Sequence, residues 1–217
     1  MDFNIKKIGL SRYADALEMQ NQTHKLVSNG GKATIILCEH PHVYTFGKSA
    51  DKNNLLVNPD FLKQISAEVF ETERGGDITY HGPGQLVGYP IINLRALGIG
   101  VKKYVESLEQ SLISALADFN ISAYQMEGLT GIWVGKDNEM KRKIGAIGIR
   151  VKNGVSMHGF ALNVNTDLSY FNHIVPCGIT DKDVTSIAKE NGSGDLDAFS
   201  ARFVYHFTIQ MQKEVVL

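Results

Sequence analysis

Two β-type runs separated by an Asn-Gly dipeptide constrain the fold of this chain more than any other feature. IGAIGIRV and VSMHGFALNV, within residues 144–164, flank Asn153-Gly154. Asn-Gly between such runs is the strongest short-range sign of a β-hairpin. A two-residue turn there would place Ile149 opposite His158, with the neighbouring pairs in step. The fold should therefore contain a long antiparallel strand pair.

Three other stretches have the spacing or composition of helices. Between residues 101 and 119, apolar residues recur every three or four positions, as in an amphipathic helix. Residues 11–28 are rich in Ala, Leu, Met and Gln and are followed by Asn29-Gly30-Gly31, a helix-stop signal. An aromatic stripe between residues 196 and 211 predicts a third helix, whose rings we expect to pack in the core.

The fold class follows from the balance of these elements. Further β-type runs cover residues 33–38, 68–72, 86–94 and 131–134. Strands outnumber helices and several are joined antiparallel, so we predict an α+β fold: a central, mostly antiparallel or mixed sheet with flanking helices. The 217 residues contain no repeat, low-complexity tract or obvious linker, which favours a single domain over residues 1–217.

Composition excludes several functional classes. The formal net charge is −1, so the chain as a whole has no electrostatic attraction to nucleic acid or to an anionic membrane. No apolar run approaches the ~20 residues of a transmembrane helix. The N-terminal residues do not resemble a signal peptide. The two cysteines, Cys38 and Cys177, form neither a disulfide framework nor a zinc-ligand pattern. We therefore expect a cytoplasmic protein with free thiols and no metal.

RGGDITYHGPGQ, residues 74–85, is the first candidate for chemistry. Its four glycines would let the backbone approach a ligand closely, with amide groups free to donate. It matches neither the phosphate-binding nor the dinucleotide-binding glycine pattern. A tight turn between strands is an equally good interpretation, and His81 alone is a weak signal.

Lys143 and Cys177 are the next candidates, and local sequence leaves both open. Lys143 precedes a strand of small residues and could stabilise a thiolate or act as a base, but it also ends the basic run KRK, which is more often solvated. Cys177 lies in HIVPCGIT, where Thr180 could cap a helix that starts at Asp181 and carries Asp183 in its first turn. Acidic residues there would oppose thiolate formation, so local sequence favours a structural thiol.

The order of the motifs changes this balance. EHPHVYTFG, RGGDITYHGPGQLVGYPIINL, KIGAIGIR, HGFALNVN and VPCGITDKDVTSI together resemble the lipoate-biosynthesis octanoyltransferases over about residues 33–187. The resemblance implies the catalytic-domain fold shared by biotin and lipoate protein ligases. It also implies transfer of an octanoyl group from octanoyl-acyl carrier protein to a lysine of a lipoyl domain. The acceptors would be lipoyl domains of 2-oxoacid dehydrogenase complexes and the glycine cleavage H protein, and no cofactor would be needed.

The resemblance also assigns roles to residues. Cys177 would be the nucleophile that carries the acyl group as a thioester, and Lys143 would lower its pKa and serve as a base. His42 stands where the family more often has proline, so its role stays open. The acyl-binding residues would be Arg74, Gly75, Gly76, Asp77, Ile78, Thr79, Tyr80, His81, Ala146, Ile147, Gly148, Gly159, Phe160 and Ala161.

Three alternatives remain. An ATP-dependent lipoate–protein ligase of the same fold would need a nucleotide site and no nucleophilic cysteine, so Cys177 in its PCG setting favours transfer. A thiol-dependent octanoyl amidotransferase of the same superfamily is the second alternative, and the sequence distinguishes it from the transferase only by degree. A non-enzymatic module that binds acyl carrier protein would retain binding after Cys177→Ser and would have no activity to lose.

Overall fold

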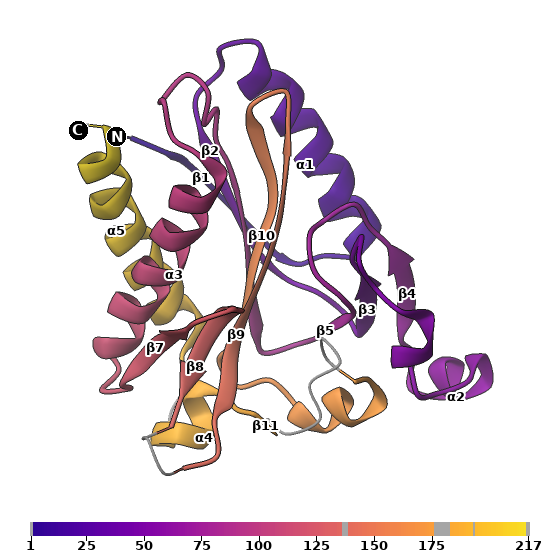
Figure 1. Ribbon diagram of the computed structural model, residues 1–217. Helices are drawn as coiled ribbons and strands as arrows, with labels where there is room; N and C mark the ends of the chain where they lie inside the picture. The colour runs from indigo at the N-terminus through magenta and orange to yellow at the C-terminus, as the bar shows by residue number, and fades with distance from the viewer. Residues whose placement is uncertain (1, 136–138, 176–182, 193, 216–217) are drawn as a thin grey trace.

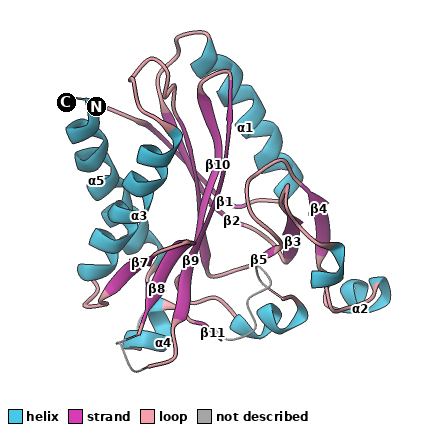
Figure 2. Ribbon diagram, in the orientation of Figure 1, coloured by secondary structure: helices cyan, strands magenta, loops and turns pink. Residues whose placement is uncertain are grey.

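A mixed sheet with helices on both faces forms the centre of the molecule (Figures 1 and 2). The computed structural model describes residues 2–135, 139–175, 183–192 and 194–215. Strands of the main sheet lie in the order β1-β2-β6-β10-β9-β8-β7, and β11 pairs with β9. The β1–β2 and β9–β11 pairs are parallel and the other pairs antiparallel. The bounds are β1 Asn4–Leu10, β2 Thr34–Glu39, β6 Gln85–Ile91, β7 Ala123–Met126, β8 Leu129–Val134, β9 Arg142–Lys152, β10 Val155–Asn163 and β11 Asp183–Val184.

The predicted hairpin is confirmed. β9 and β10 are antiparallel with Ile149 opposite His158, as the Asn-Gly turn requires. Asn153 and Gly154 have φ angles of 54° and 84°, the left-handed conformation that a type I′ turn demands at both central positions. The hairpin runs through the middle of the sheet (Figure 1), so the site described below is built on a rigid element.

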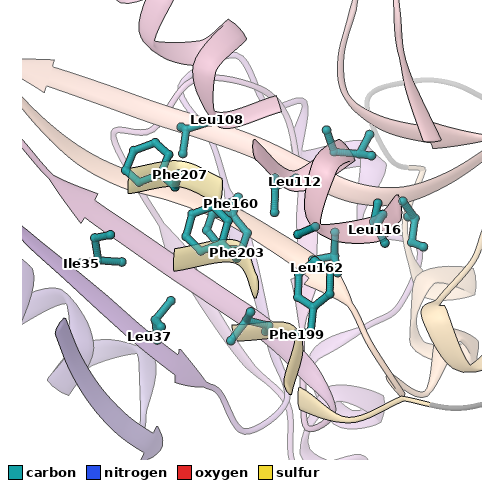
Figure 3. Packing of buried hydrophobic residues seen from close by; sticks show 14 of the residues in the cluster. Ile35, Leu37, Leu108, Leu112, Leu116, Phe160, Leu162, Phe199, Phe203 and Phe207 are labelled. Carbon is teal, nitrogen blue, oxygen red and sulfur yellow. The ribbon is translucent and has the colours of Figure 1, made fainter. Parts of the chain in front are cut away.

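Two helices, α3 (Val101–Ala117) and α5 (Leu196–Val215), cover one face of the sheet. The aromatic stripe of α5 is fully buried, with Phe199, Phe203 and Phe207 at 0% exposure. Phe203 packs on Phe160 of β10 with ring centroids 4.4 Å apart (Figure 3). Each such side chain contributes about 1.5–3 kcal/mol by leaving water, so the predicted core role of the stripe is confirmed.

The opposite face carries α1 (Tyr13–Ser28), which packs against β6 and β10. Its apolar residues Ala16 and Val27 join a smaller buried cluster that includes Cys38 of β2. Burial raises the pKa of the Cys38 thiol well above its usual range, so this cysteine stays a protonated core residue, as its setting in an apolar strand predicted.

A second, three-stranded sheet lies beside the main one, in the order β4-β3-β5. Residues 72–78, which include the first five residues of the glycine-rich loop, connect β4 to β5, and the rest of the loop forms β5 and its connection to β6. The β3 and β5 strands are only four and three residues long, too short to be predicted from alternation of apolar residues. The bounds of these and the remaining elements are β3 Val43–Phe46, η1 Lys52–Asn54, α2 Pro59–Gln64, β4 Glu68–Glu71, β5 Thr79–His81, η2 Leu168–His173 and α4 Ile187–Asn191.

The helix predicted after Cys177 is partly wrong. Thr180 and Asp181 lie outside the described residues, but Asp183 belongs to β11, where it pairs with Arg142 instead of entering a helix. The next helix, α4, begins at Ile187, and Ser186 caps it by accepting a hydrogen bond from the Lys189 amide. Pairing with the edge of β9 satisfies the backbone at residues 183–184 before the helix can start. No helix within the described ranges is long and apolar enough to cross a bilayer.

Candidate active site

A cavity of about 290 Å³ lies between the β9–β10 hairpin and the glycine-rich loop. Its lining is mainly apolar and backbone, drawn from β6, β8, β9, β10 and residues 74–81. Of the predicted acyl-binding residues, Gly75 and Tyr80 are not part of the lining. The predicted residues that line it are Arg74, Gly76, Asp77, Ile78, Thr79, His81, Ala146, Ile147, Gly148, Gly159, Phe160 and Ala161, together with Lys143.

Close approach of the loop to the hairpin depends on a glycine in β9. The Gly75 amide donates to the Ile149 carbonyl at 2.9 Å. A Cβ added at Gly148 would lie 2.8 Å from the Gly75 carbonyl oxygen, closer than real Cβ atoms come to backbone oxygens. The prediction that small residues on this strand mark the approach of another backbone is therefore confirmed at Gly148.

Arg74 holds the loop in shape. Its side chain is almost fully buried, and its guanidinium donates to the carbonyls of Thr45, Gly75 and Asp77 and to the Thr45 hydroxyl. Charge-assisted bonds of this kind are stronger than neutral ones. Arg74 thus fixes the cavity wall from inside the loop and ties it to β3.

His81 is neutral and hydrogen-bonded at both ring nitrogens. The Gln85 side-chain amide donates to the Tyr80 carbonyl and to Asn163 Oδ1, so its oxygen is left to accept from His81 Nδ1, at 2.8 Å. The other ring nitrogen then accepts from the Thr45 hydroxyl, at 3.3 Å. Burial, aided by the charge of His40, lowers the pKa of His81 to about 3. His81 is therefore a support for Thr45 and Arg74 and has no ring nitrogen left to act as a base.

Lys143 lies at the opposite end of β9 from the hairpin turn. Its ammonium sits 5.1 Å from the centre of the Trp133 ring, a cation–π distance. Gly131 of β8 leaves room for it, because a Cβ there would lie 2.5 Å from Lys143 Cε. Lys143 is half-buried and lines the cavity, so it is not simply part of a solvated basic face. Its neighbour Arg142 instead makes a two-point ion pair with Glu190.

Glu109 of α3 is a second ionisable group near Lys143, although it does not itself line the cavity. Its carboxylate accepts hydrogen bonds from the Gly131 amide and the Gln125 side chain, both at 3.0 Å. Burial raises the pKa of Glu109, while these hydrogen bonds and the nearby Lys143 charge act to lower it. The nearby Glu109 carboxylate therefore favours the charged form of Lys143.

The chain that follows Cys177 returns to this point. Cys177 itself lies outside the described residues. The described chain resumes at Asp183, and Val184 lies beside Lys143 in the β9–β11 pair. The Thr185 amide donates to the Lys143 carbonyl at 3.0 Å, and the Thr185 carbonyl accepts from Asn163 at 2.9 Å. Strand pairing thus brings residues more than 40 positions apart in sequence together at the lysine end of the cavity.

A tyrosine–histidine cluster holds the chain that precedes Cys177. Tyr170 of η2 stacks on His42 with ring centroids 4.2 Å apart, and both rings stack against Tyr80. His42 also hydrogen-bonds to the hydroxyls of Tyr80 and Tyr170. The Tyr44 hydroxyl bonds to His173 Nδ1 at 2.8 Å. The departure from the family pattern at His42 thus has a structural role, and Tyr80 packs in this cluster and does not line the cavity.

Three residues in or near the site were not predicted from the sequence: Glu109, Asn163 and Trp133. The sequence pattern around the first two could have indicated them. Glu109 is an acidic residue placed between apolar positions of the predicted amphipathic helix. Asn163 shares a strand face with Gly159 and Ala161 at a spacing of two. Trp133 lies in an ordinary β-type run, and nothing in the sequence distinguishes it from a core residue.

Comparison with known proteins decides the family. The family model for the lipoyl protein ligase A/B catalytic domain matches residues 12–208. The chain belongs to this family. Among its sequence relatives, an octanoyltransferase of Solibacter usitatus is 48% identical over 94% of this chain and 90% of its own length. One of Bacteroides thetaiotaomicron is 55% identical over 72% of this chain and 69% of its own length.

Solved structures of the family share the fold at low identity. A lipoate-protein ligase A bound with ATP has a TM-score of 0.79 at 15% identity, with 98% of this chain and 86% of that chain covered. A putative lipoate protein ligase from T. acidophilum with bound lipoic acid has a TM-score of 0.79 at 14% identity, with 98% and 87% covered. The predicted α+β class and ligase catalytic-domain fold are confirmed.

Proposed function

We propose that this chain is an octanoyltransferase that moves an octanoyl group from octanoyl-acyl carrier protein to a lysine of a lipoyl domain, with Cys177 carrying the acyl group between the two. The observation that best supports this proposal is the mainly apolar cavity with Lys143 at one end, in a chain whose relatives at 48–55% identity are octanoyltransferases. Residues 1–217 would act together as one catalytic domain in the cytoplasm.

The cavity suits a straight alkyl chain. Gly145, Ala146, Gly148, Gly159 and Ala161 line it, and side chains this small leave a channel along the hairpin. Each methylene of a bound acyl chain would contribute ~0.8 kcal/mol by leaving water. An octanoyl group can therefore bind through its chain alone, while the reacting carbonyl lies toward Lys143.

The two half-reactions balance without a cofactor. The Cys177 thiolate attacks the thioester carbonyl, and the phosphopantetheine thiolate leaves and takes up a proton. The neutral amine of the acceptor lysine then attacks the acyl-enzyme, an amide forms, and the Cys177 thiolate leaves. The Lys143 ammonium would stabilise the thiolate in both steps, and its deprotonated form could accept the proton lost by the amine.

The position of β11 supports a Cys177–Lys143 partnership. The Val184–Lys143 pairing and the bond from the Thr185 amide hold the chain seven residues after Cys177 beside the lysine. On the other side, the chain that ends at Val175 is fixed by its amide's hydrogen bond to the Asn54 carbonyl and by the Tyr170–His42 stack. The segment with Cys177 is thus anchored at both of its described ends.

Transfer is favoured over ATP-dependent ligation. The structural neighbours that include ligases are 13–15% identical, which supports the shared fold alone. The relatives at about 50% identity are octanoyltransferases, and the PCG setting of Cys177 supplies the nucleophile that a ligase does not need. The amidotransferase alternative uses the same thiol and differs in its donor.

A donor-exchange assay tests the function. The protein is incubated, in parallel with and without ATP, with an unmodified lipoyl domain and either octanoyl-acyl carrier protein, octanoyl-lipoyl domain, or free octanoate. We expect acylation of the acceptor lysine from the carrier protein alone, and its loss in Cys177→Ser. Acylation only from octanoate with ATP would show a ligase, and acylation only from the octanoylated domain would show an amidotransferase.

A further inference from the structure

A short segment, residues 47–56, runs between the glycine-rich loop and the end of η2. At its start, the Lys48 amide donates to the Arg74 carbonyl at 2.9 Å. At its end, the Leu56 amide donates to the His173 carbonyl, also at 2.9 Å. The segment therefore connects one wall of the cavity to the chain that leads toward the proposed nucleophile.

Asn54, the last residue of η1, bonds to both of these parts at once. Its carbonyl accepts from the amide of Val175, two residues before Cys177, at 2.8 Å. Its side-chain amide donates to Asp77 Oδ2 at 2.6 Å, and Asp77 lines the cavity. An ionised carboxylate can only accept hydrogen bonds, so this contact requires an NH₂ group on the side chain of Asn54. One residue thus joins the cavity wall to the chain before Cys177 through a bond of defined polarity.

Asp77 is held on its other sides by the glycine-rich loop. Its second carboxylate oxygen accepts from the Ile78 amide at 2.7 Å, and its carbonyl accepts from the Arg74 guanidinium at 2.8 Å. The carboxylate cannot turn to another donor without losing the Ile78 bond. Hydrogen bonds to a charged group are also about twice as strong as neutral ones. The bond from Asn54 therefore helps to hold the loop and the chain at Val175 in one relative position.

We propose that Asn54 is a positioning residue for acyl transfer, which sets the distance between the cavity wall at Asp77 and the chain that leads from Val175 to Cys177. Asn54 does not line the cavity, so it acts through these two partners. Reacting atoms must come within ~3–3.5 Å of each other, and a misplacement of about 1 Å can lower a rate ~100-fold. This inference rests on the proposed role of Cys177 and adds a residue that helps to place it.

Reversal of the bond's polarity tests the inference. Asn54→Asp sets two carboxylates against each other, so the bond is lost and the groups repel. In the double variant Asn54→Asp/Asp77→Asn, the amide at position 77 can donate to the carboxylate at position 54 while its oxygen still accepts from Ile78. We expect Asn54→Asp to lower the single-turnover rate of enzyme acylation by roughly 10–100-fold, and the double variant to recover most of that loss. Asp77→Asn alone should lose less, because the Asn54 amide can rotate to accept.

The adjacent Asn53 offers a matched control, since it belongs to the same short helix but is exposed. Asn53→Asp introduces the same charge and should leave the acylation rate unchanged. Asn54→Ala removes the donor without adding charge, and it takes the place of Asn54→Asp if that variant does not fold. An equal loss in Asn53→Asp, no rescue in the double variant, or full activity in Asn54→Ala would overturn the assignment.

Hydrogen exchange separates this inference from the proposed function. The Val175 amide bonds to the Asn54 carbonyl, so its exchange rate reports the connection without any turnover. We expect faster exchange in the peptide that contains Val175 for Asn54→Asp, and the wild-type rate for the double variant. If wild type forms no acyl-enzyme, the proposed function fails, and the exchange rates still decide whether Asn54 couples the loop to this chain. Equal exchange in the three proteins would overturn the coupling.

Discussion

The contact between Gly148 and the glycine-rich loop gives the sharpest mutational test of the site. Gly148 has no left-handed φ, so its own backbone accepts alanine, but the new Cβ would lie 2.8 Å from the Gly75 carbonyl oxygen. Ordinary contacts begin near 3.4 Å, so the loop must move by about 3.4 − 2.8 = 0.6 Å. The opposing atom is backbone, which cannot rotate away as a flexible side chain would.

The expected cost follows from that displacement. Overpacking of this kind destabilises by ~1–3 kcal/mol, and a misplacement approaching 1 Å can lower a rate ~100-fold. We expect Gly148→Ala to reduce kcat/KM for octanoyl transfer by about 10–100-fold while the protein remains folded. Steady-state kinetics and a thermal melt, run together, separate the effect on catalysis from the loss of stability.

A neighbouring glycine provides the comparison. A Cβ at Gly75 would meet only the Ile149 carbonyl oxygen, at 3.5 Å, which is ordinary van der Waals contact. Gly75→Ala should therefore retain a kcat/KM at least fivefold higher than that of Gly148→Ala. Equal effects of the two substitutions, or full activity in Gly148→Ala, would refute the argument that Gly148 sets the loop position.

Three further predictions concern charge. Lys143→Ala should slow acylation of the enzyme at neutral pH and recover in part at higher pH, where Cys177 ionises unaided; a flat pH profile would assign the lysine a different role. Glu109→Gln removes a carboxylate that favours the Lys143 ammonium, so the alkaline limb of the pH–rate profile should move to lower pH, and an unmoved limb would contradict the coupling. Burial lowers the pKa of His81 to about 3 and of His158 to about 4; both histidines take up protons only when the chain unfolds, so stability should fall as pH drops from 6.5 toward 4. The free energy of unfolding should fall by up to ~1.4 kcal/mol per pH unit for each histidine. Urea unfolding at several pH values should therefore show a weaker dependence of this free energy on pH in His158→Asn than in wild type.

Local pattern was enough for much of the scaffold. The hairpin was predictable because Asn153-Gly154 specifies both turn geometry and register, and the α5 stripe was predictable because its aromatic residues repeat at helical spacing. By contrast, β3 and β5 are short and are defined by their partners, so no pattern within four residues could reveal them. Asp183 was misassigned because a favourable helix start gave way to pairing with the edge of β9.

The site was less accessible to local reasoning than the scaffold. Local sequence left the role of Lys143 open, and its position in the cavity depends on the room that Gly131 leaves for it and on the Trp133 ring beside it. The left-handed backbone of His158, with a φ of 55°, was equally hidden, since its strand pattern predicts extended geometry and its amide instead donates to Gln20 of α1. Only the combined order of motifs led from residues to a reaction.

The central claim is that Cys177 becomes acylated, and intact-protein mass spectrometry tests it directly. The protein is mixed with one equivalent of octanoyl-acyl carrier protein, without ATP or acceptor, and quenched in acid before peptide mapping. We predict one octanoyl group on the peptide that contains Cys177, released by neutral hydroxylamine and absent in Cys177→Ser. Wild type that remains unmodified under these single-turnover conditions, or becomes modified only when ATP is added, would contradict it.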